Sequence, residues 1–213
     1  AFDTDWLREF AGRYPVEIGL PFIANATVDQ IDDETAELLN SAGCNMIKIG
    51  VECAPGPIRK NVLGRPFGEK RIRDAFNCLK KHEINSMAYL MVGIPGERKE
   101  DIMATFRFAA GLRPDAVRVA MFCPFEGTQI YADLAEKDMI TDTWKVSGFL
   151  GKSVLKWDED MAVLLDETID MAPWLLNSYL EGTVGVASAK VVERIIKKGR
   201  SGILGNDLRA KIA

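Results

Sequence analysis

Polar side chains follow three apolar runs of this chain, each at the point where Gly or Pro breaks the run. The segments are IKIGVECAP (47–55), YLMVGIPGE (89–97) and MFCPFEGTQIY (121–131). Short loops connect the first two to strong helical patterns and the third to a weaker one. This order is typical of successive strand–loop–helix units, and it predicts that Glu52, Glu97 and Glu126 lie at one rim of a parallel sheet. That rim, at the carboxyl ends of the strands, is where ligands bind.

Three of the polar residues could recognise a ligand with hydroxyl, ammonium or carboxylate groups. A carboxylate directly after a strand, as at Glu52, can accept hydrogen bonds from ribose hydroxyls or from an ammonium group. Asn25 offers an amide at a neighbouring strand end, and the planar guanidinium of Arg65 suits a ligand carboxylate. A purely structural alternative remains open, in which Glu52 is a surface carboxylate paired with Lys48 or Arg65.

Two loops could line a planar ligand. Gly93, Pro95 and Gly96 belong to the loop GIPG, whose backbone can approach a ligand closely because two of its four residues lack a side chain. The segment 123–125 (CPF), with Pro124 and Phe125, adds an apolar wall. The alternative is that GIPGE only begins a helix, where Glu97 would be favourable at the amino end.

The elements that must position these residues follow from the apolar patterns. Strand starts near 46, 86 and 116 are separated by about 40 and 30 residues, a spacing that suits βα units. We expect strands at 20–24, 46–51, 86–92 and 116–122. We expect helices at 3–14, from Asp32 or Asp33 to 42, around 72–79 and 102–109, and at 129–136.

The pattern changes after about residue 138. Residues 157–180 are rich in Leu, Met and Trp, with Pro173 as an interruption, and residues 187–198 are amphipathic. We therefore expect an α/β part over residues 1–140 and a helical extension over residues 141–213.

Composition narrows the function classes. The chain has 213 residues, of which 47% are hydrophobic and 27% are charged, and its formal charge is −4. A negative net charge argues against general nucleic-acid binding, and no run reaches the ~20 apolar residues of a membrane span. No secretory leader is visible, which favours a cytoplasmic location. The chain begins without Met, which is what a piece of a longer protein would show.

The cysteines indicate neither a zinc site nor a redox dithiol. They lie at 44, 53, 78 and 123, with no CxxC pair. We expect Cys53 and Cys123, which approach the rim, to be small apolar residues. The single histidine, His82, lies near a helix end beside Lys81, where a solvated or dipole-complementing role is expected. No nucleophile–base pair is visible, so no catalytic residue and no metal ligand is assigned.

The joint pattern resembles the radical S-adenosylmethionine (SAM) superfamily, and within it the branch often associated with a cobalamin-binding domain. The matching segments are AGCNMIKIGVE (42–52), VLGRP (62–66), AYLMVGIPGERKEDIMATFRFA (88–109) and FCPFEGTQIY (122–131). The resemblance implies an α/β fold with parallel strands, the later four strands of a six-stranded partial βα barrel, followed by the helical extension.

The resemblance also implies roles for individual residues. Asn25 would contact the aminoacyl part of SAM, Glu52 its ribose and Arg65 its carboxylate. The backbone of 93–96 and the segment 123–125 would line the adenine site.

Two departures from the family pattern matter. Cys53 stands where this branch often has Ser. The CxxxCxxC loop that binds the 4Fe-4S cluster is absent, as is the Gly-rich tip of the second strand, and the resemblance implies that both precede residue 1.

These observations predict a portion of an enzyme that cleaves SAM reductively for hydrogen abstraction or methyl transfer on a small molecule, inactive alone, with cobalamin as a candidate further cofactor. The alternatives are a non-catalytic binding or assembly module and an ordinary βα-barrel metabolic enzyme. Without the first two strands, the strand at 20–24 would have an open edge, through which the chain could self-associate.

Overall fold

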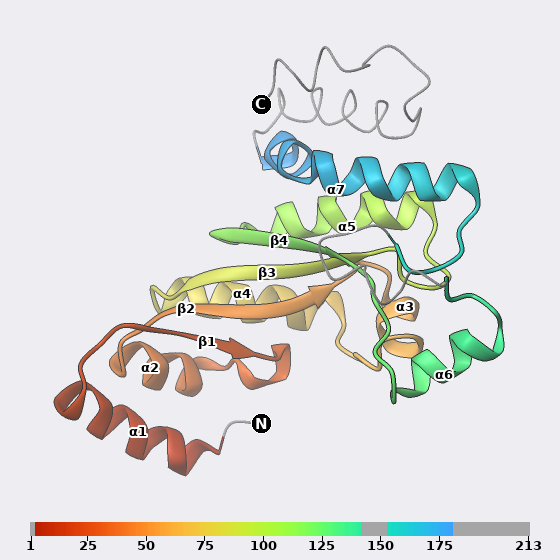
Figure 1. The fold of residues 1–213 in the computed structure, drawn as a ribbon. Helices are drawn as coiled ribbons and strands as arrows, with labels where there is room; N and C mark the ends of the chain where they lie inside the picture. Colours follow the sequence, from red (N-terminus) through yellow and green to blue (C-terminus); the bar gives the residue numbers. More distant parts are fainter. Residues whose placement is uncertain (1–2, 142–152, 181–213) are drawn as a thin grey trace. The chain divides into compact units, whose positions relative to one another are not determined.

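The computed structural model describes residues 3–141 and 153–180. Four strands form one sheet in the order β1-β2-β3-β4 (Figure 1). They are β1 (Phe22–Ala26), β2 (Cys44–Glu52), β3 (Asn85–Val92) and β4 (Ala116–Met121).

All neighbouring strands run in parallel. Parallel pairing joins β1 to β2 and β2 to β3. Asp115 N donates to Ser86 O at the start of β3 (3.0 Å), and Phe122 N donates to Val92 O at its end (2.8 Å), so β4 follows the direction of β3. The predicted α/β fold with a parallel sheet is confirmed.

Helices connect and follow the strands. They are α1 (Thr4–Glu17), the 3-10 turn η1 (Val28–Gln30), α2 (Asp33–Ser41), α3 (Gly56–Asn61), α4 (Glu69–Lys81), α5 (Lys99–Leu112), α6 (Gln129–Glu136) and α7 (Glu159–Leu180). The helix predicted at 129–136 has the predicted bounds, whereas α3 and η1 were not predicted.

The first strand lies two residues later than its predicted position. Ile18 N and Gly19 N both donate to Tyr14 O (2.9 Å each), and Gly19 has a φ of +67°. This turn ends α1, and the extended backbone of β1 therefore begins later in the sequence than predicted. Leu20 consequently stays outside the strand, with 64% of its surface exposed.

The chain forms two compact units, which the sequence did not predict. The N-terminal unit comprises Ala1–Leu90 and Leu112–Arg118, and the C-terminal unit comprises Met91–Gly111 and Val119–Ala213. The boundary expected at residue 140 remains a prediction, and the amphipathic segment expected at 187–198 lies outside the described residues.

The N-terminal unit has its core between β2 and its helices. α1 packs on α2, and α2 packs against β2 and α4. Ile47 and Ile49 of β2 and Leu79 of α4 are completely buried. Asp32 begins α2 as its N-cap, because its carboxylate accepts a hydrogen bond from Thr35 N (2.8 Å).

In the C-terminal unit α5 and α7 lie side by side (Figure 1). Lys99 pairs with Asp160 near their amino ends (3.6 Å), and Arg107 donates to the Tyr179 hydroxyl near their carboxyl ends (3.3 Å), so the two helices run parallel. The predicted interruption at Pro173 is wrong. α7 continues through it, with Ala172 and Leu175 buried on either side, and we infer that this packing offsets the hydrogen bond that Pro cannot donate.

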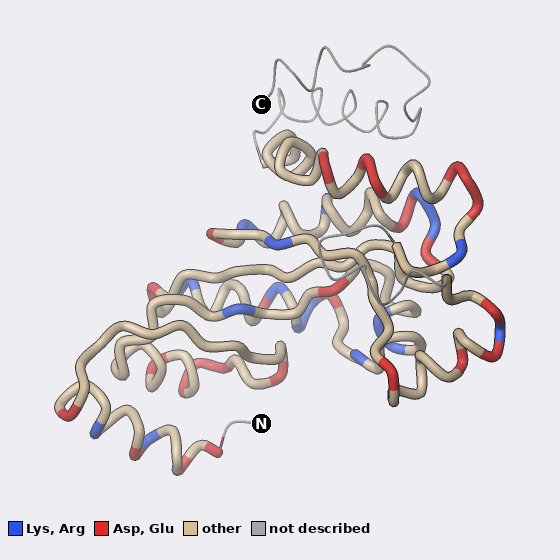
Figure 2. Tube along the Cα trace, viewed as in Figure 1, with Lys and Arg blue, Asp and Glu red and all other residues tan. Residues whose placement is uncertain are grey.

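Acidic and basic residues are mixed along α1 and α4, whereas the charged residues of α2 and α7 are all acidic (Figure 2). In α1, Arg13 pairs with both Glu9 and Glu17 at 2.8 Å. The first turns of α5 and α7 are acidic, which suits the positive amino end of a helix. Among the described residues, no helix is long and apolar enough to cross a membrane.

Candidate functional site

Glu52 ends β2 in a conformation that few non-glycine residues adopt. Its φ is +66°, and the register between β2 and β3 shifts between Gly50 and Glu52. The carboxylate folds back over the backbone of Gly50, where a Cβ atom would overlap Oε1. A strained residue at the carboxyl end of a strand is a common feature of binding sites.

The Glu52 carboxylate is half-buried and remains open to a ligand. Burial raises the pKa of Glu52, and the charge of Arg65 opposes that rise. Within the described residues, the Glu52 carboxylate forms no hydrogen bond or ion pair. Both oxygens can therefore accept hydroxyl donors, and the exposed guanidinium of Arg65 supplies a nearby positive charge.

A buried arginine, which sequence reasoning missed, holds the loops on both sides of α3. Arg59 is only 2% exposed. Its guanidinium donates to Cys53 O (2.6 Å), to Ala54 O and to Phe67 O (3.3 Å).

The backbone of this arginine also fixes Arg65. Arg65 N donates to Arg59 O at 2.7 Å. The side chain of Arg59 thus fixes the backbone just after Glu52, and the backbone carbonyl of Arg59 positions Arg65. The six-residue helix in which Arg59 lies is too short to show a helical periodicity in the sequence. The Pro- and Gly-rich segments on both sides of that helix could have indicated loops with a fixed conformation.

Asn25 lies on the neighbouring strand and is exposed. Its register partner is Lys48, four residues before Glu52 along β2. Within residues 3–141 and 153–180, Asn25 forms no hydrogen bond with Glu52 or Arg65. The structure thus brings Glu52 and Arg65 into electrostatic contact, and places Asn25 on the adjoining strand without joining it to them.

In the C-terminal unit, the GIPG loop begins with a glycine that the fold requires. Gly93 has a φ of +78°, and a Cβ atom there would lie 3.0 Å from Met121 Sδ and 3.3 Å from a Leu165 methyl group. Gly96 has a φ of +83° with open space around it. Gly93 is buried, Pro95 is half-buried and Gly96 is exposed, so the second half of the loop can meet a ligand.

The buried carboxylate of Glu97 accepts hydrogen bonds from the backbone of this loop. Its Oε2 accepts hydrogen bonds from Gly93 N (2.7 Å) and Ile94 N (3.2 Å), while Oε1 is buried without a partner among the described residues. The side chain is 4% exposed. Glu97 follows the carboxyl end of β3, as the sequence predicted, but its carboxyl group turns inward and binds the loop.

Two effects act on Glu97 in opposite directions. Burial raises its pKa to about 7, whereas the two backbone N–H donors lower it. Burial dominates, because Oε1 receives no hydrogen bond that would offset its lost hydration. Glu97 is thus a loop-positioning group rather than a ligand contact.

The segment after β4 lies at the same sheet end as the GIPG loop, because Phe122 N bonds to Val92 O immediately before both. Pro124 is buried, and Phe125 is 58% exposed. Thr128 donates to Phe125 O through both its backbone N (3.2 Å) and its hydroxyl (2.6 Å), which fixes the turn. The two segments therefore leave the sheet at the same end, with Gly96 and Phe125 exposed and Gly93 and Pro124 buried.

The four cysteines do not fit an iron–sulfur cluster. None of the four forms a disulfide, and Cys44 and Cys53 are buried whereas Cys78 and Cys123 are half-buried. Within the described residues, no three of their sulfur atoms come together. A 4Fe-4S cluster needs closely grouped thiolates, so these cysteines cannot hold one.

Comparison with known proteins agrees with this architecture. The Radical SAM superfamily matches residues 5–109. An uncharacterized methyltransferase from Pyrococcus horikoshii is 23% identical over 129 residues, which are 60% of this chain and 28% of that protein. The ribosomal protein uS12 methylthiotransferase RimO of Clostridium kluyveri is 30% identical over 145 residues, 67% of this chain and 29% of that protein.

A solved structure shows the same fold. The radical S-adenosylmethionine methyltransferase TsrM from Kitasatospora setae, determined with cobalamin and a [4Fe-4S] cluster, superposes with a TM-score of 0.56 at 18% identity. The alignment covers 75% of this chain and 31% of that chain.

The parallel sheet and its helices define an α/β protein. Over residues 5–109, this chain belongs to the radical SAM superfamily. It spans less than a third of the length of the two curated relatives described above.

Proposed function

We propose that this chain is part of a radical SAM enzyme that acts on a small molecule by hydrogen abstraction or methyl transfer. The observation that carries the proposal is the strained Glu52 carboxylate, open at a strand end and beside the charge of Arg65. The family match and the methyltransferases among the relatives support the reaction class. A cytoplasmic location remains a prediction.

The proposed contacts with SAM follow from the chemistry of the residues predicted for the site. The Glu52 carboxylate, with both oxygens open, would accept hydrogen bonds from the ribose hydroxyls. The exposed Arg65 guanidinium would pair with the SAM carboxylate, and the Asn25 amide would contact the aminoacyl part. In the C-terminal unit, Gly93, Pro95 and Gly96, with Pro124 and Phe125, would contact the adenine. Bound SAM supplies a 5′-deoxyadenosyl radical or a methyl group when it is cleaved.

The chain's own residues would bind and orient SAM but would not reduce it. Its cysteines do not fit a 4Fe-4S cluster, so we propose that the cluster ligands come from another part of the protein and that this chain alone is inactive. Cobalamin, present in the TsrM structure, is a candidate further cofactor.

The test is made on the enzyme that contains this chain, purified anaerobically with its cluster reconstituted. We expect 5′-deoxyadenosine or S-adenosylhomocysteine on reduction in the presence of SAM, and at least about tenfold weaker SAM binding for Glu52→Gln and Arg65→Ala. Glu136→Gln and Lys137→Ala, exposed on and after α6, are the matched controls. An enzyme that forms neither product, or that binds SAM equally in all four variants, would favour a non-catalytic binding module.

A further inference from the structure

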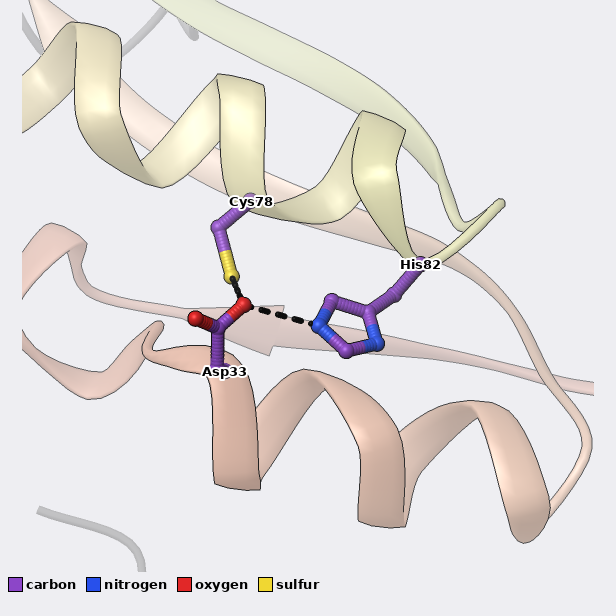
Figure 3. A group of neighbouring side chains, drawn as sticks. All are labelled: Asp33, Cys78 and His82. Carbon is purple, nitrogen blue, oxygen red and sulfur yellow. Dashed lines mark hydrogen bonds and ion pairs between the residues drawn. The ribbon is translucent and has the colours of Figure 1, made fainter.

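Three metal-ligating side chains meet on the surface of the N-terminal unit, outside the site described above (Figure 3). Asp33 is the first residue of α2, Cys78 lies in the last turns of α4, and His82 is the C-cap of α4. Asp33 Oδ1 lies 2.9 Å from His82 Nε2 and 3.7 Å from Cys78 Sγ. One ligand atom from each residue falls within 4.8 Å of the other two.

The arrangement has the geometry of a chelate. Cys78 and His82 are four residues apart, so they project from the same face of the helix. Asp33 faces both from the adjoining helix (Figure 3). Bond lengths of about 2.0–2.3 Å to a tetrahedral zinc ion place its ligand atoms roughly 3.3–3.7 Å apart. The separation between Asp33 and Cys78 lies in that range, the separation between Asp33 and His82 is shorter, and the third pair lies within 4.8 Å.

We propose that Asp33, Cys78 and His82 bind one divalent transition-metal ion of the zinc class, with the fourth position open to water. The thiol and imidazole donors select borderline or soft cations over Mg²⁺ and Ca²⁺, which prefer oxygen ligands. Binding releases the Cys78 thiol proton to solvent, and neutral His82 donates its Nε2 lone pair. The site is open to solvent, since the Asp33 side chain is 67% exposed.

The local charge favours a cation. The charges of Asp32 and Asp33 act on Cys78, opposed by the charge of Lys81, and the charge of Glu37 acts on Lys81. The carbonyl end of α4 adds partial negative charge, and the acidic first turn of α2 offsets the positive end of that helix.

Lys81 competes with the metal for the same oxygen. Its Nζ donates to Asp33 Oδ1 at 2.8 Å, from a side chain that is 65% exposed. A metal ion would displace this flexible ammonium group into solvent. The same contacts could instead serve only to fasten α2 to α4 as an ion-pair network. Lys81 separates the two interpretations, because its removal strengthens a metal site and weakens a network.

The cysteine spacing alone gave no indication of this site. Asp33 and Cys78 are 45 residues apart and meet only because α2 packs against α4. The proposal does not depend on the proposed radical SAM function, since it concerns a different set of residues and is tested without SAM.

The experiment titrates the full chain with Zn²⁺ by calorimetry and with Co²⁺ by absorption, under reducing conditions. We expect one ion per chain and a thiolate-to-cobalt charge-transfer band that Zn²⁺ removes. Cys78→Ser, His82→Gln and Asp33→Asn should each weaken binding by roughly tenfold or more, and Cys78→Ser should abolish the band. Cys123→Ser, the other half-buried thiol, should change neither. Lys81→Met should bind the metal several-fold more tightly.

A second measurement needs no variant. His82 is the only histidine of the chain, so the histidine ring ¹⁵N resonances of the unmodified protein can be assigned to it without any variant. Zn²⁺ should shift the Nε2 resonance. Absence of the thiolate band, an unshifted His82 ring, binding that Cys78→Ser leaves unchanged, or no gain for Lys81→Met would each overturn the proposal.

Discussion

The carboxylate of Glu52 occupies the space where a side chain at Gly50 would begin. The positive φ of Glu52 and the shifted register at this point of β2 direct the side chain back over Gly50. Absence of a side chain at residue 50 is therefore what allows the carboxylate to keep its position near Arg65. Gly50 and Glu52 therefore act as one structural unit in the candidate site.

Gly50→Ala should impair ligand binding without unfolding the protein. The atom that the new methyl group meets is the far end of a flexible side chain, which can move away. We expect the free energy of unfolding to change by less than about 1 kcal/mol. SAM binding to the reconstituted enzyme should weaken about tenfold, as for the loss of a charge-assisted hydrogen bond. Calorimetry and denaturant unfolding measure the two effects separately.

Gly12→Ala is the control for that substitution. Gly12 lies inside α1, and a Cβ atom there would meet nothing within 4 Å. We expect it to stabilise the helix by about 0.5–1 kcal/mol with no effect on SAM binding. Equal SAM affinity for Gly50→Ala and Gly12→Ala would contradict the role given to the Glu52 carboxylate.

Arg59→Met should be the costlier change, although Arg59 touches no proposed ligand. It removes the hydrogen bonds that Arg59 donates to Cys53 O, Ala54 O and Phe67 O. We expect a loss of about 3 kcal/mol in the free energy of unfolding. Lys60→Met, on the exposed neighbouring residue, should stay within about 0.5 kcal/mol of the unmodified protein. Similar unfolding midpoints for the two variants would show that the loop does not depend on Arg59.

Glu97 should make the stability of the chain depend on pH. Its pKa is about 7 in the fold, against 4.5 for an ordinary glutamate. Because the folded-state pKa is raised, the contribution is fully present below about pH 4.5 and is lost as the pH rises to about 7. The loss amounts to about 3 kcal/mol. The measurement is the difference in free energy of unfolding between the unmodified protein and Glu97→Gln across that range.

Other titrating groups cancel in this difference, because both proteins contain them. Glu100→Gln, at an exposed residue of α5, should give a difference that is flat with pH. A flat difference for Glu97→Gln as well would mean that the two backbone donors, rather than burial, determine the charge of Glu97.

The sequence predicted those parts of the fold that follow from local patterns. Apolar runs broken by Gly or Pro predicted β2 and β3, and the helical spacing from Ile72 to Leu79 predicted α4. The position of Glu52 directly after an apolar run correctly placed its carboxylate at a strand end. These predictions succeeded because each depends on residues that are neighbours along the chain.

The remaining features depend on contacts between distant residues or on a choice between two orientations. Nothing in the local sequence distinguishes Arg59, which is buried, from Lys60, which is exposed. Glu97 could face solvent or its own loop, and only the packing around Gly93 decides between them. The contact of Asp33 with His82 arises from the packing of α2 on α4.

β1 has an open edge in the part of the chain that the structure describes. It pairs with β2 on one side, and Ile23 is 54% exposed. α1 packs on α2, and its Phe10 and Tyr14 rings meet the Phe22 ring edge-on, with centroids 5.6 Å and 5.3 Å apart. The strand is thus anchored on one face, while its edge can pair with another strand.

We expect the isolated chain to self-associate through this edge. Ile23→Lys should lower the dimer fraction, because an edge lysine must remain hydrated and opposes strand pairing. Val16→Lys is the matched control, since Val16 is 86% exposed and belongs to α1 rather than to the strand. Light scattering at equal protein concentrations measures the association, with circular dichroism confirming that each variant is folded. A chain that stays monomeric at every concentration, or one whose dimer fraction falls equally with both lysines, would show that the β1 edge is not the contact.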